Sequence, residues 1–434
     1  MFEPKRLLAL MGCVIMLFST CASAEDFADN YNDENETTIT EEELLELDGA
    51  LDMQNVDEVI AVESQLATTF REYSTLGASV AVIQNGEITF TYQYGKSGIR
   101  GDEVTADTGF QVASISKLVS NIGLMQLVEA GKAKLDDDLS DLFGFEVRNP
   151  DYPDTPITLR QLMSHTAGFA DHKYYQQALQ GKVRKLSEIF TGSSRRILYR
   201  DDTKPGSKRH YSNFGGGLIG SLIEKLSGQQ LDAYMAEHVF TPLGITASYQ
   251  PNQLPTDMLL ADMYSMPKGK IEKRLRDDAK VVTKESWETA YVYSAGKLVI
   301  TAVDLAKIIS ALCDGGIYGD VRILEESTVL EMTKRQGNRF SVDCECTHGL
   351  FMNIITDYQV RGRTVYGHGG KANGMLCAAY FDPTDRTGVV MLTNGCENDR
   401  AYYGCGLLGR AILRVCYDEV IGDKHQYIDP FLVD

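Results

Sequence analysis

The 434-residue chain is poor in positive charge, with 42 Lys and Arg against 61 Asp and Glu and a formal net charge of −19 at pH 7. No Lys or Arg occurs from Glu25 to Phe70. Phosphate backbones and anionic membranes attract basic surfaces, so this balance argues against nucleic acid or an anionic membrane as a partner. Residues 25–55 are dense in acidic and amide side chains, and we expect an acidic, disordered leader there.

The sequence also lacks a long apolar run. A bilayer span needs about 18 continuous apolar residues, and no stretch reaches that length. The run Leu7–Leu17 follows the basic pair Lys5-Arg6 and precedes Ala22-Ser23-Ala24, which is the pattern of a secretory signal peptide with its cleavage site. We therefore expect residues 1–24 to be removed and the protein to be exported, either secreted or associated with the cell envelope. The alternative is a lipoprotein signal, in which a lipid on Cys21 would anchor the protein to a membrane.

Motifs for metals and phosphate groups are missing as well. No C-x-x-C occurs, and Cys344-Glu345-Cys346 is too tight for an ordinary zinc site. Seven of the nine cysteines lie from Cys313 onward, and this odd number leaves at least one thiol unpaired within the chain. The run Gly215-Gly216-Gly217 is not followed by the Gly-Lys-Ser/Thr of a phosphate loop, so close helix packing is its better explanation. We expect no metal and no cofactor, and cysteines that are core residues or partly disulfide-bonded.

The order of the predicted elements indicates an α+β fold. Apolar periodicity and turn residues predict a helix and a hairpin near the N-terminus, and a hairpin and a helix near the C-terminus. The N-terminal elements are Val56–Tyr73, Ala78–Gln84 and Glu87–Tyr94, and the C-terminal elements are Met375–Phe381, Gly388–Thr393 and Arg400–Val415. Asn85-Gly86 predicts the tight turn of the first hairpin. Most segments between the two hairpins are expected to be helical, among them a short helix over Ile157–Gly168, a helix that ends at Ser227-Gly228 and a helix over Thr301–Leu312. We expect one domain over residues 56–425, with an antiparallel sheet built from both ends, flanking N- and C-terminal helices and an inserted all-helical subdomain at about 119–290.

The segment around Ser114 carries the first chemical signal. Ser114 and Lys117 are three residues apart, which puts both side chains on one face of a helix that begins near Ser114. Apolar residues continue at helical spacing to Val128, and Gly131 stands where a helix-ending glycine belongs. A lysine packed one turn into a helix loses solvation, which makes it a candidate base for a nucleophilic serine. This is the S-x-x-K arrangement of acyl-transferring serine enzymes.

The same spacing occurs in two other places. Ser265 and Lys268 enclose a proline, which disfavours a regular helix, and Ser294 and Lys297 enclose a glycine. Only the copy at Ser114 opens a long amphipathic run. Two further motifs give it a context: Tyr211-Ser212-Asn213 is the only Y-x-N in the chain, and His368-Gly369-Gly370 is the only H-x-G.

With these three motifs in this order, the chain resembles the penicillin-recognising serine hydrolases, in the branch of class C β-lactamases, D,D-peptidases and related esterases. The resemblance covers about Glu63 to Val415 and implies a β-lactamase/transpeptidase-like fold. It also implies a serine nucleophile, Ser114, that forms an acyl-enzyme, with Lys117 and Tyr211 as acid–base groups. Which of these two groups acts first stays open.

The resemblance also assigns the groups that bind the substrate. Asn213 is expected to bind Lys117 and the substrate amide, and the backbone N–H groups of Ser114 and Lys371 to form the oxyanion hole. His368, Gly369 and Gly370 would line the strand edge along which the substrate lies. His165, in Ser-His-Thr, is the other histidine near a motif, and the resemblance implies a structural rather than catalytic role for it.

One departure from the family pattern bears on the substrate. Class C β-lactamases carry Lys-Thr-Gly where this chain has His368-Gly369-Gly370, so a permanent cation is replaced by a mostly neutral imidazole. This favours a D-alanyl peptide or a small ester over a β-lactam as substrate, either a small molecule or one derived from peptidoglycan. The alternatives are a class C-like β-lactamase and, in another functional class, a penicillin-binding sensor module without turnover.

Overall fold

The computed structural model describes residues 53–201, 203–266, 268, 270–271, 273–275, 286–337, 347–356, 363–372, 374–397 and 406–422. The predicted signal peptide, Cys21 and nearly all of the acidic leader lie outside these residues. The chain divides after Glu58 into two units, and the architecture that follows belongs to the second unit, from Val59 onward. Among the described helices, none is both long and apolar enough to cross a membrane.

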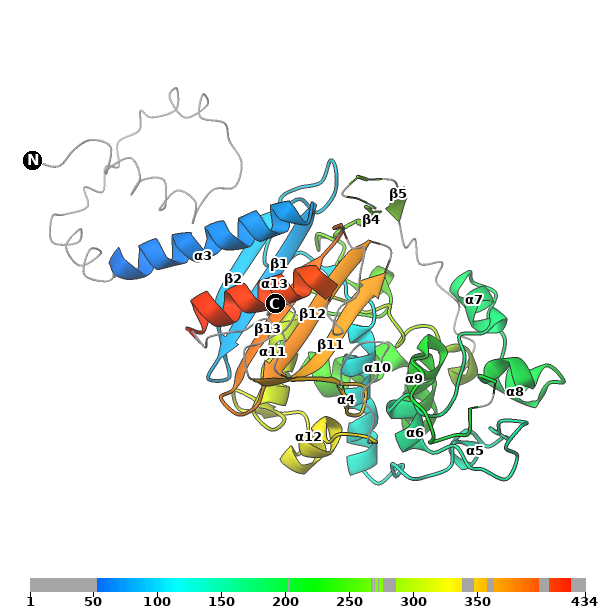
Figure 1. Ribbon diagram of the computed structural model, residues 1–434. Helices are drawn as coiled ribbons and strands as arrows, with labels where there is room; N and C mark the ends of the chain where they lie inside the picture. Colours follow the sequence, from blue (N-terminus) through cyan, green and yellow to red (C-terminus); the bar gives the residue numbers. More distant parts are fainter. Residues whose placement is uncertain are drawn as a thin grey trace, which may run out of the picture. The chain divides into compact units, whose positions relative to one another are not determined.

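A seven-stranded antiparallel sheet forms the centre of the fold, in the order β2-β1-β13-β12-β11-β10-β9 (Figure 1). Its strands are β1 (Gly77–Gln84), β2 (Glu87–Gly95), β9 (Thr347–His348), β10 (Asn353–Thr356), β11 (Thr364–Ala372), β12 (Met375–Asp382) and β13 (Thr387–Thr393). The N-terminal β1 pairs directly with the C-terminal β13, with Ala78 opposite Thr393. This confirms the expected antiparallel sheet made from both ends of the chain.

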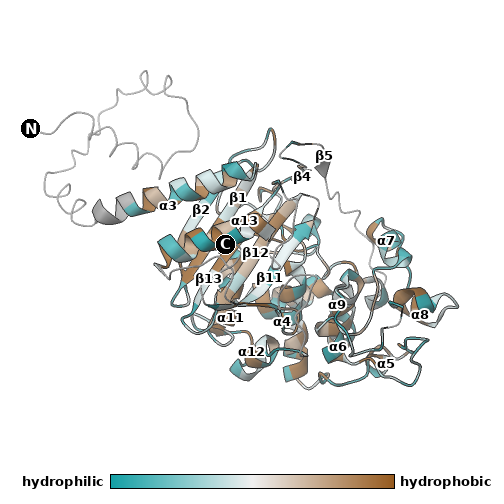
Figure 2. Ribbon diagram, viewed as in Figure 1, coloured by the Kyte–Doolittle hydropathy of each residue, from teal (hydrophilic) through white to brown (hydrophobic). Residues whose placement is uncertain are grey.

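Helices cover both faces of the sheet. On one face, the part of α3 (Met53–Glu72) from Val59 onward and α13 (Gly406–Val415) pack on the strands, and Val80 and Val82 of β1 point toward them. On the other face lie α4 (Ile115–Glu129) and α11 (Ala302–Cys313), with Ala81 and Ile83 of β1 buried on that side. The alternation along β1 is the period-two pattern of a strand buried on both faces. In Figure 2, teal and brown alternate along α3 and α13, as expected for amphipathic helices.

The segment between α4 and α11 is mostly helical and forms the right-hand part of Figure 1. Its helices are α5 (Leu139–Phe143), α6 (Leu159–Met163), α7 (Lys173–Leu179), α8 (Leu186–Thr191), α9 (Asn213–Ser227) and α10 (Leu231–Met235). The described short strands are β3 (Phe110–Gln111) with β6 (Val299–Ile300), β4 (Met263–Ser265) with β5 (Lys273–Leu275), and β7 (Ile317–Tyr318) with β8 (Val321–Arg322). Helix α12 (Glu326–Thr333) follows β8.

Two predicted helices differ from the observed ones. The expected helix from Ile157 to Gly168 is only α6, which begins with a capping box between Thr158 and Gln161 and ends at Ser164. It stops there because His165 turns into the left-handed region, with a φ of 58°. The expected C-terminal helix is described from Gly406, and its predicted start at Arg400 lies outside the described residues.

The cysteines that the structure describes are core residues. Cys313, Cys377, Cys396 and Cys416 are buried and free, and burial raises the pKa of the Cys396 thiol to about 11. Such thiols carry little thiolate at neutral pH and are poor nucleophiles. The remaining mature cysteines, Cys344, Cys346 and Cys405, lie outside the described residues.

Candidate active site

The candidate nucleophile stands at a sharp turn from a strand into a helix. β3 pairs with β6, and the backbone N–H of Val112 then donates to the carbonyl of Leu298. Ala113 adopts a φ of 46°, a left-handed conformation that costs a non-glycine residue roughly 1 kcal/mol. Helix α4 begins directly after it. Ser114 occupies the N-cap position but makes no side-chain cap hydrogen bond, so its hydroxyl remains available to other partners.

Two polar groups reach the Ser114 hydroxyl at once. The amine of Lys117 lies 3.0 Å from Ser114 Oγ, and the Tyr211 hydroxyl donates to Ser114 Oγ at 2.8 Å. Lys117 is completely buried. Its Nζ lies 5.1 Å from the centre of the Tyr211 ring. The structure therefore brings together the three residues that the sequence motifs singled out. Tyr211 is 94 residues from Lys117 and 97 residues from Ser114 along the chain.

Lys117 has two further partners, and both can only accept a hydrogen bond from it. Its Nζ donates to Asn213 Oδ1 at 2.9 Å and to the carbonyl of Ala295 at 2.5 Å. Together with Ser114 Oγ, these two acceptors occupy three positions around Nζ. An ammonium group would donate at all three positions, whereas a neutral amine would donate at two and hold its lone pair at the third. The remaining position on Nζ then faces Ser114 Oγ. The geometry thus allows Lys117 to take a proton from the serine or return it.

Helix α9 supplies residues that contact Lys117 and fix the position of its side chain. Asn213 is the first residue of this helix, and Ser212 caps it by accepting from the backbone N–H of Gly215 at 3.0 Å. A Cβ atom at Gly216 would lie 2.4 Å from Cε of Lys117, whereas one at Gly215 would meet only ordinary contacts of 3.5 Å or more. The glycine run therefore provides close helix packing, as expected, and at Gly216 it makes room for the lysine stem.

The H-x-G motif lies on β11, beside the nucleophile. Gly370 passes so close to the segment before Ser114 that a Cβ atom there would lie 2.3 Å from the carbonyl oxygen of Val112. β10 pairs with β11 only as far as Gly367. Among the described residues, no strand pairs with the edge of β11 from His368 to Ala372, and such an edge can present backbone N–H groups to a ligand. Lys371 and Ser114 line the same pocket, which fits the expected oxyanion pair.

His368 is buried and neutral. Its Nδ1 lies 2.6 Å from the carbonyl oxygen of Gly369, and because a carbonyl only accepts, the proton is on Nδ1. Burial and then the nearby Lys117 lower the pKa of His368 to about 3. The ring lies 6.2 Å from that of Tyr211. The imidazole therefore offers no positive charge to a substrate at neutral pH.

His165 supports the tyrosine and does not contact the serine in any described hydrogen bond. Its ring centre lies 4.4 Å from that of Tyr211, and its Nδ1 accepts from the backbone N–H of Ser212 at 3.3 Å. Burial, together with the charge of Arg209, holds the pKa of His165 well below its usual value. These contacts agree with the expected structural role.

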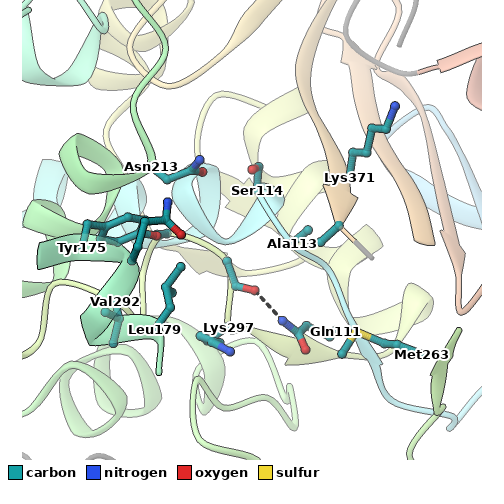
Figure 3. Close-up of a pocket in the computed structure, with 14 residues that line it drawn as sticks. Gln111, Ala113, Ser114, Tyr175, Leu179, Asn213, Met263, Val292, Lys297 and Lys371 are labelled. Carbon is teal, nitrogen blue, oxygen red and sulfur yellow. Dashed lines mark hydrogen bonds between the residues drawn. The ribbon is translucent and has the colours of Figure 1, made fainter. Parts of the chain in front are cut away.

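A pocket of about 420 Å³ opens beside Ser114. In Figure 3, Asn213 lies on one side of Ser114 and Lys371 on the other, while Tyr175, Leu179 and Val292 form a wall below them. The side chain of Gln111 donates to the carbonyl of Gly296 at 2.8 Å and joins the two segments that form the floor. Two lysines, Lys297 and Lys371, and no carboxylate occur among the described lining residues.

Sequence reasoning missed Asp171, which lies in the loop before α7. Its carboxylate accepts from Asn213 Nδ2 at 2.7 Å, from Ser212 Oγ at 3.1 Å and from the backbone N–H of Phe214 at 2.9 Å. These contacts join residues 41 to 43 positions apart, and no local spacing rule connects them. Within the described part of the chain, no cluster of His, Cys, Asp and Glu could hold a metal ion.

Comparisons with known proteins identify a family for the chain. The model of the family described as Beta-lactamase matches residues 56–404. A putative D-alanyl-D-alanine carboxypeptidase from Escherichia coli O157:H7 is 26% identical over 354 residues, which cover 73% of this chain and 78% of the relative. Penicillin-binding protein 4 from Amycolatopsis lactamdurans is 26% identical over 337 residues, with coverage of 75% and 82%.

Solved structures show the same fold. The D-amino acid amidase from Ochrobactrum anthropi SV3, complexed with L-phenylalanine, superposes with a TM-score of 0.66 at 22% identity, over 85% of this chain and 99% of that one. The fold is therefore β-lactamase/transpeptidase-like, as the resemblance implied. Because the family model matches most of its length, the chain belongs to the Beta-lactamase family of penicillin-recognising serine hydrolases.

Proposed function

We propose that the protein is an exported serine hydrolase that acts on D-alanyl peptides or small esters through an acyl-enzyme on Ser114. The observation that carries the proposal is that Ser114 Oγ lies within hydrogen-bond distance of both Lys117 Nζ, at 3.0 Å, and the Tyr211 hydroxyl, at 2.8 Å. A serine hydroxyl becomes a competent nucleophile when an adjacent base takes its proton. Both candidate bases are already in place.

In the acylation step, Ser114 Oγ forms a bond to the substrate carbonyl carbon and its proton passes to Lys117 or Tyr211. The carbonyl oxygen becomes an oxyanion, which the backbone N–H groups of Ser114 and Lys371 would stabilise. The carbon–nitrogen or carbon–oxygen bond then breaks, and Tyr211 returns the proton to the leaving amine or alcohol. In deacylation, the same pair takes a proton from water while the water oxygen bonds to the acyl carbon. The bond between that carbon and Ser114 Oγ then breaks, and the pair returns the proton to Ser114 Oγ.

Two features, the neutral His368 and the lining of the pocket, support the substrate class. His368 is neutral, so it gives a carboxylate beside the H-x-G edge no charge-assisted hydrogen bond. The described lining carries lysines and no carboxylate, which favours an acyl group that is neutral or anionic over one with a free ammonium group. A short ester without a carboxylate meets both conditions, and an N-acylated D-alanyl peptide, whose acyl part carries no ammonium group, meets the second.

The test combines labelling with turnover. A fluorophosphonate or a fluorescent penicillin should label the wild-type protein and leave Ser114→Ala unlabelled, whereas Ser265→Ala should label as the wild type does. Steady-state turnover of N-acetyl-D-Ala-D-Ala and p-nitrophenyl esters should exceed turnover of nitrocefin. Equal labelling of wild type and Ser114→Ala would refute the nucleophile, faster nitrocefin hydrolysis would identify a β-lactamase, and a single acylation burst would identify a sensor.

Export is the second part of the proposal, and the pattern from Lys5 to Ala24 supports it. N-terminal sequencing of the mature protein from the cell envelope or the medium should begin at Glu25. A blocked, lipid-bearing Cys21 would replace secretion with membrane anchoring. An N-terminus at Met1 in an intracellular fraction would contradict export.

A further inference from the structure

Asp171 shares its two carboxylate oxygens among three donors around the start of α9. Oδ2 accepts from Asn213 Nδ2, and Oδ1 accepts from both Ser212 Oγ and the backbone N–H of Phe214. The carboxylate thus caps the helix from a separate segment and also holds the side chain of Asn213. No substrate group is required for any of these bonds.

The contact decides which atom of Asn213 meets the lysine. An amide side chain has a donor end and an acceptor end, and it can turn over if its neighbours allow it. The carboxylate of Asp171 only accepts, so it binds Nδ2, while Lys117 offers an N–H group and binds Oδ1. Both neighbours demand the same orientation. Without the carboxylate, the turned-over amide would point its N–H groups at the N–H groups of Lys117.

The orientation of the Asn213 amide in turn fixes the direction in which Lys117 Nζ faces Ser114. Because Asn213 Oδ1 and the carbonyl of Ala295 occupy two positions on Lys117 Nζ, the remaining position faces Ser114 Oγ. If Asn213 turns an N–H group toward Nζ instead, that N–H can take up the lone pair of a neutral Lys117, and the lone pair is then not available to accept the proton of Ser114 Oγ. Asp171 therefore acts two steps away from the nucleophile, through Asn213 and Lys117.

We propose that Asp171 is a positioning residue that holds the amide of Asn213 so that Lys117 can exchange a proton with Ser114. This rests on the proposed function, in which Ser114 is the nucleophile and Lys117 a base. It also predicts a limit on substrate binding, because one N–H of Asn213 is already engaged by Asp171. A single N–H group remains on that side chain for a substrate carbonyl.

The experiment measures the rate at which a small fluorophosphonate labels Ser114, since this probe has no amide that needs Asn213. Asp171→Asn should slow labelling by roughly ten- to a hundredfold, the scale of a misplaced catalytic group, and should change the pH profile of the rate. Asp138→Asn is the matched control, because Asp138 also caps a helix, α5, through the backbone N–H of Ser140. The control should lower the unfolding midpoint and keep the labelling rate and its pH profile.

A reciprocal swap separates positioning from helix capping. Asn213→Asp alone places two carboxylates face to face and should label slowly. The double variant Asp171→Asn/Asn213→Asp restores an acceptor toward Lys117 and a donor between the two side chains, so it should label roughly tenfold faster than Asn213→Asp. Labelling of folded Asp171→Asn at the wild-type rate and pH profile would overturn the proposal. If Asp171→Asn does not fold, a swap no faster than Asn213→Asp would overturn it, whereas loss of the label at Ser114 in the wild type would refute the proposed function instead.

Discussion

A serine precedes a lysine by three residues in three places, and the surroundings of each hydroxyl separate them. Ser294 donates to the carbonyls of Gly216 and Gly217 and accepts from the N–H of Gly220, so its hydroxyl joins α9 to the segment before β6. Ser265 is the last residue of β4. Among the described contacts of these three pairs, the one between Lys117 Nζ and Ser114 Oγ joins the lysine amine to the serine hydroxyl across a helical turn. The three-residue spacing alone therefore does not identify a catalytic pair, because the lysine amine must also lie beside the serine hydroxyl.

The first residue-scale prediction concerns Tyr211. Tyr211→Phe removes the hydroxyl that donates to Ser114 Oγ and leaves the ring on His165, so the fold should persist. Turnover should fall by roughly a hundredfold or more, the usual contribution of a general acid–base group. Steady-state kinetics on an ester and a D-Ala-D-Ala peptide measure the loss. Wild-type rates in a folded Tyr211→Phe would show that another group carries the proton.

The second concerns His368, the residue that departs from the β-lactamase pattern. His368→Lys places a cation where the buried imidazole is neutral. Activity on substrates with a carboxylate at that point should rise about ten- to hundredfold relative to neutral substrates, the equivalent of a charge-assisted hydrogen bond of roughly 1.5–3 kcal/mol. The readout is the ratio of kcat/KM for the two substrates. His368→Gln, which adds no charge, is the control, and an unchanged ratio in folded His368→Lys would contradict the prediction.

At the scale of elements, the parts of the fold that local signals determine were predicted correctly. Asn85-Gly86 has the left-handed φ values of a tight hairpin turn, 54° and 81°, between β1 and β2. Gly228 ends α9 in the left-handed conformation, and Thr301 caps α11. In each case a few neighbouring residues determine the backbone, so periodicity and turn chemistry suffice.

Other features depend on contacts that a single sequence does not reveal. The end of α6 is set by the left-handed His165, whose carbonyl accepts from the backbone N–H of His210 far along the chain. Asp171 and Ala295 reach the site only because the insert folds back onto α4. The roles assigned to the site residues came from the order of three motifs, and these roles stay predictions until they are measured.

The next prediction compares two neighbouring glycines of α9, Gly215 and Gly216, of which only Gly216 packs tightly against Lys117. Gly216→Ala places a methyl group 2.4 Å from Cε of Lys117, and the flexible lysine stem must move aside. Ser114 labelling should then slow by about a hundredfold, since a displacement of that order misaligns the base. Gly215→Ala is the matched control, with its nearest contact at 3.5 Å, and it should stabilise the helix by up to about 1 kcal/mol without changing the rate. Equal labelling rates for the two variants would contradict this reading of the glycine run.

At the scale of the whole molecule, the site depends on the sheet that joins the two ends of the chain. β1 and β13 pair, and β12 connects them to β11, which carries the H-x-G motif. Ser114 and Tyr211 come from the segments between these strands. The three motifs therefore meet only when the long-range strand pairing has formed, and the stability of the whole domain sets the integrity of the site.

Buried histidines make that stability depend on pH. Burial lowers the pKa of His172 to about 4 and that of His368 to about 3, from 6.5 in the unfolded chain. The unfolded state then binds more protons than the folded state below pH 6.5, so the free energy of unfolding falls as the pH drops from 6.5 toward the folded values. Between pH 7 and pH 5, each such histidine should remove about 2 kcal/mol of stability. Urea unfolding at the two pH values measures the loss.

His172→Asn isolates one of these contributions. His172 caps α7 by accepting from the backbone N–H of Tyr175 through Nδ1, and asparagine keeps an acceptor at that position while removing the titrating group. The variant should therefore lose about 2 kcal/mol less than the wild type when the pH falls from 7 to 5. His238→Asn changes a partly exposed histidine and should follow the wild-type dependence. If both variants lose stability as the wild type does, the acid sensitivity comes from groups other than the buried imidazole of His172.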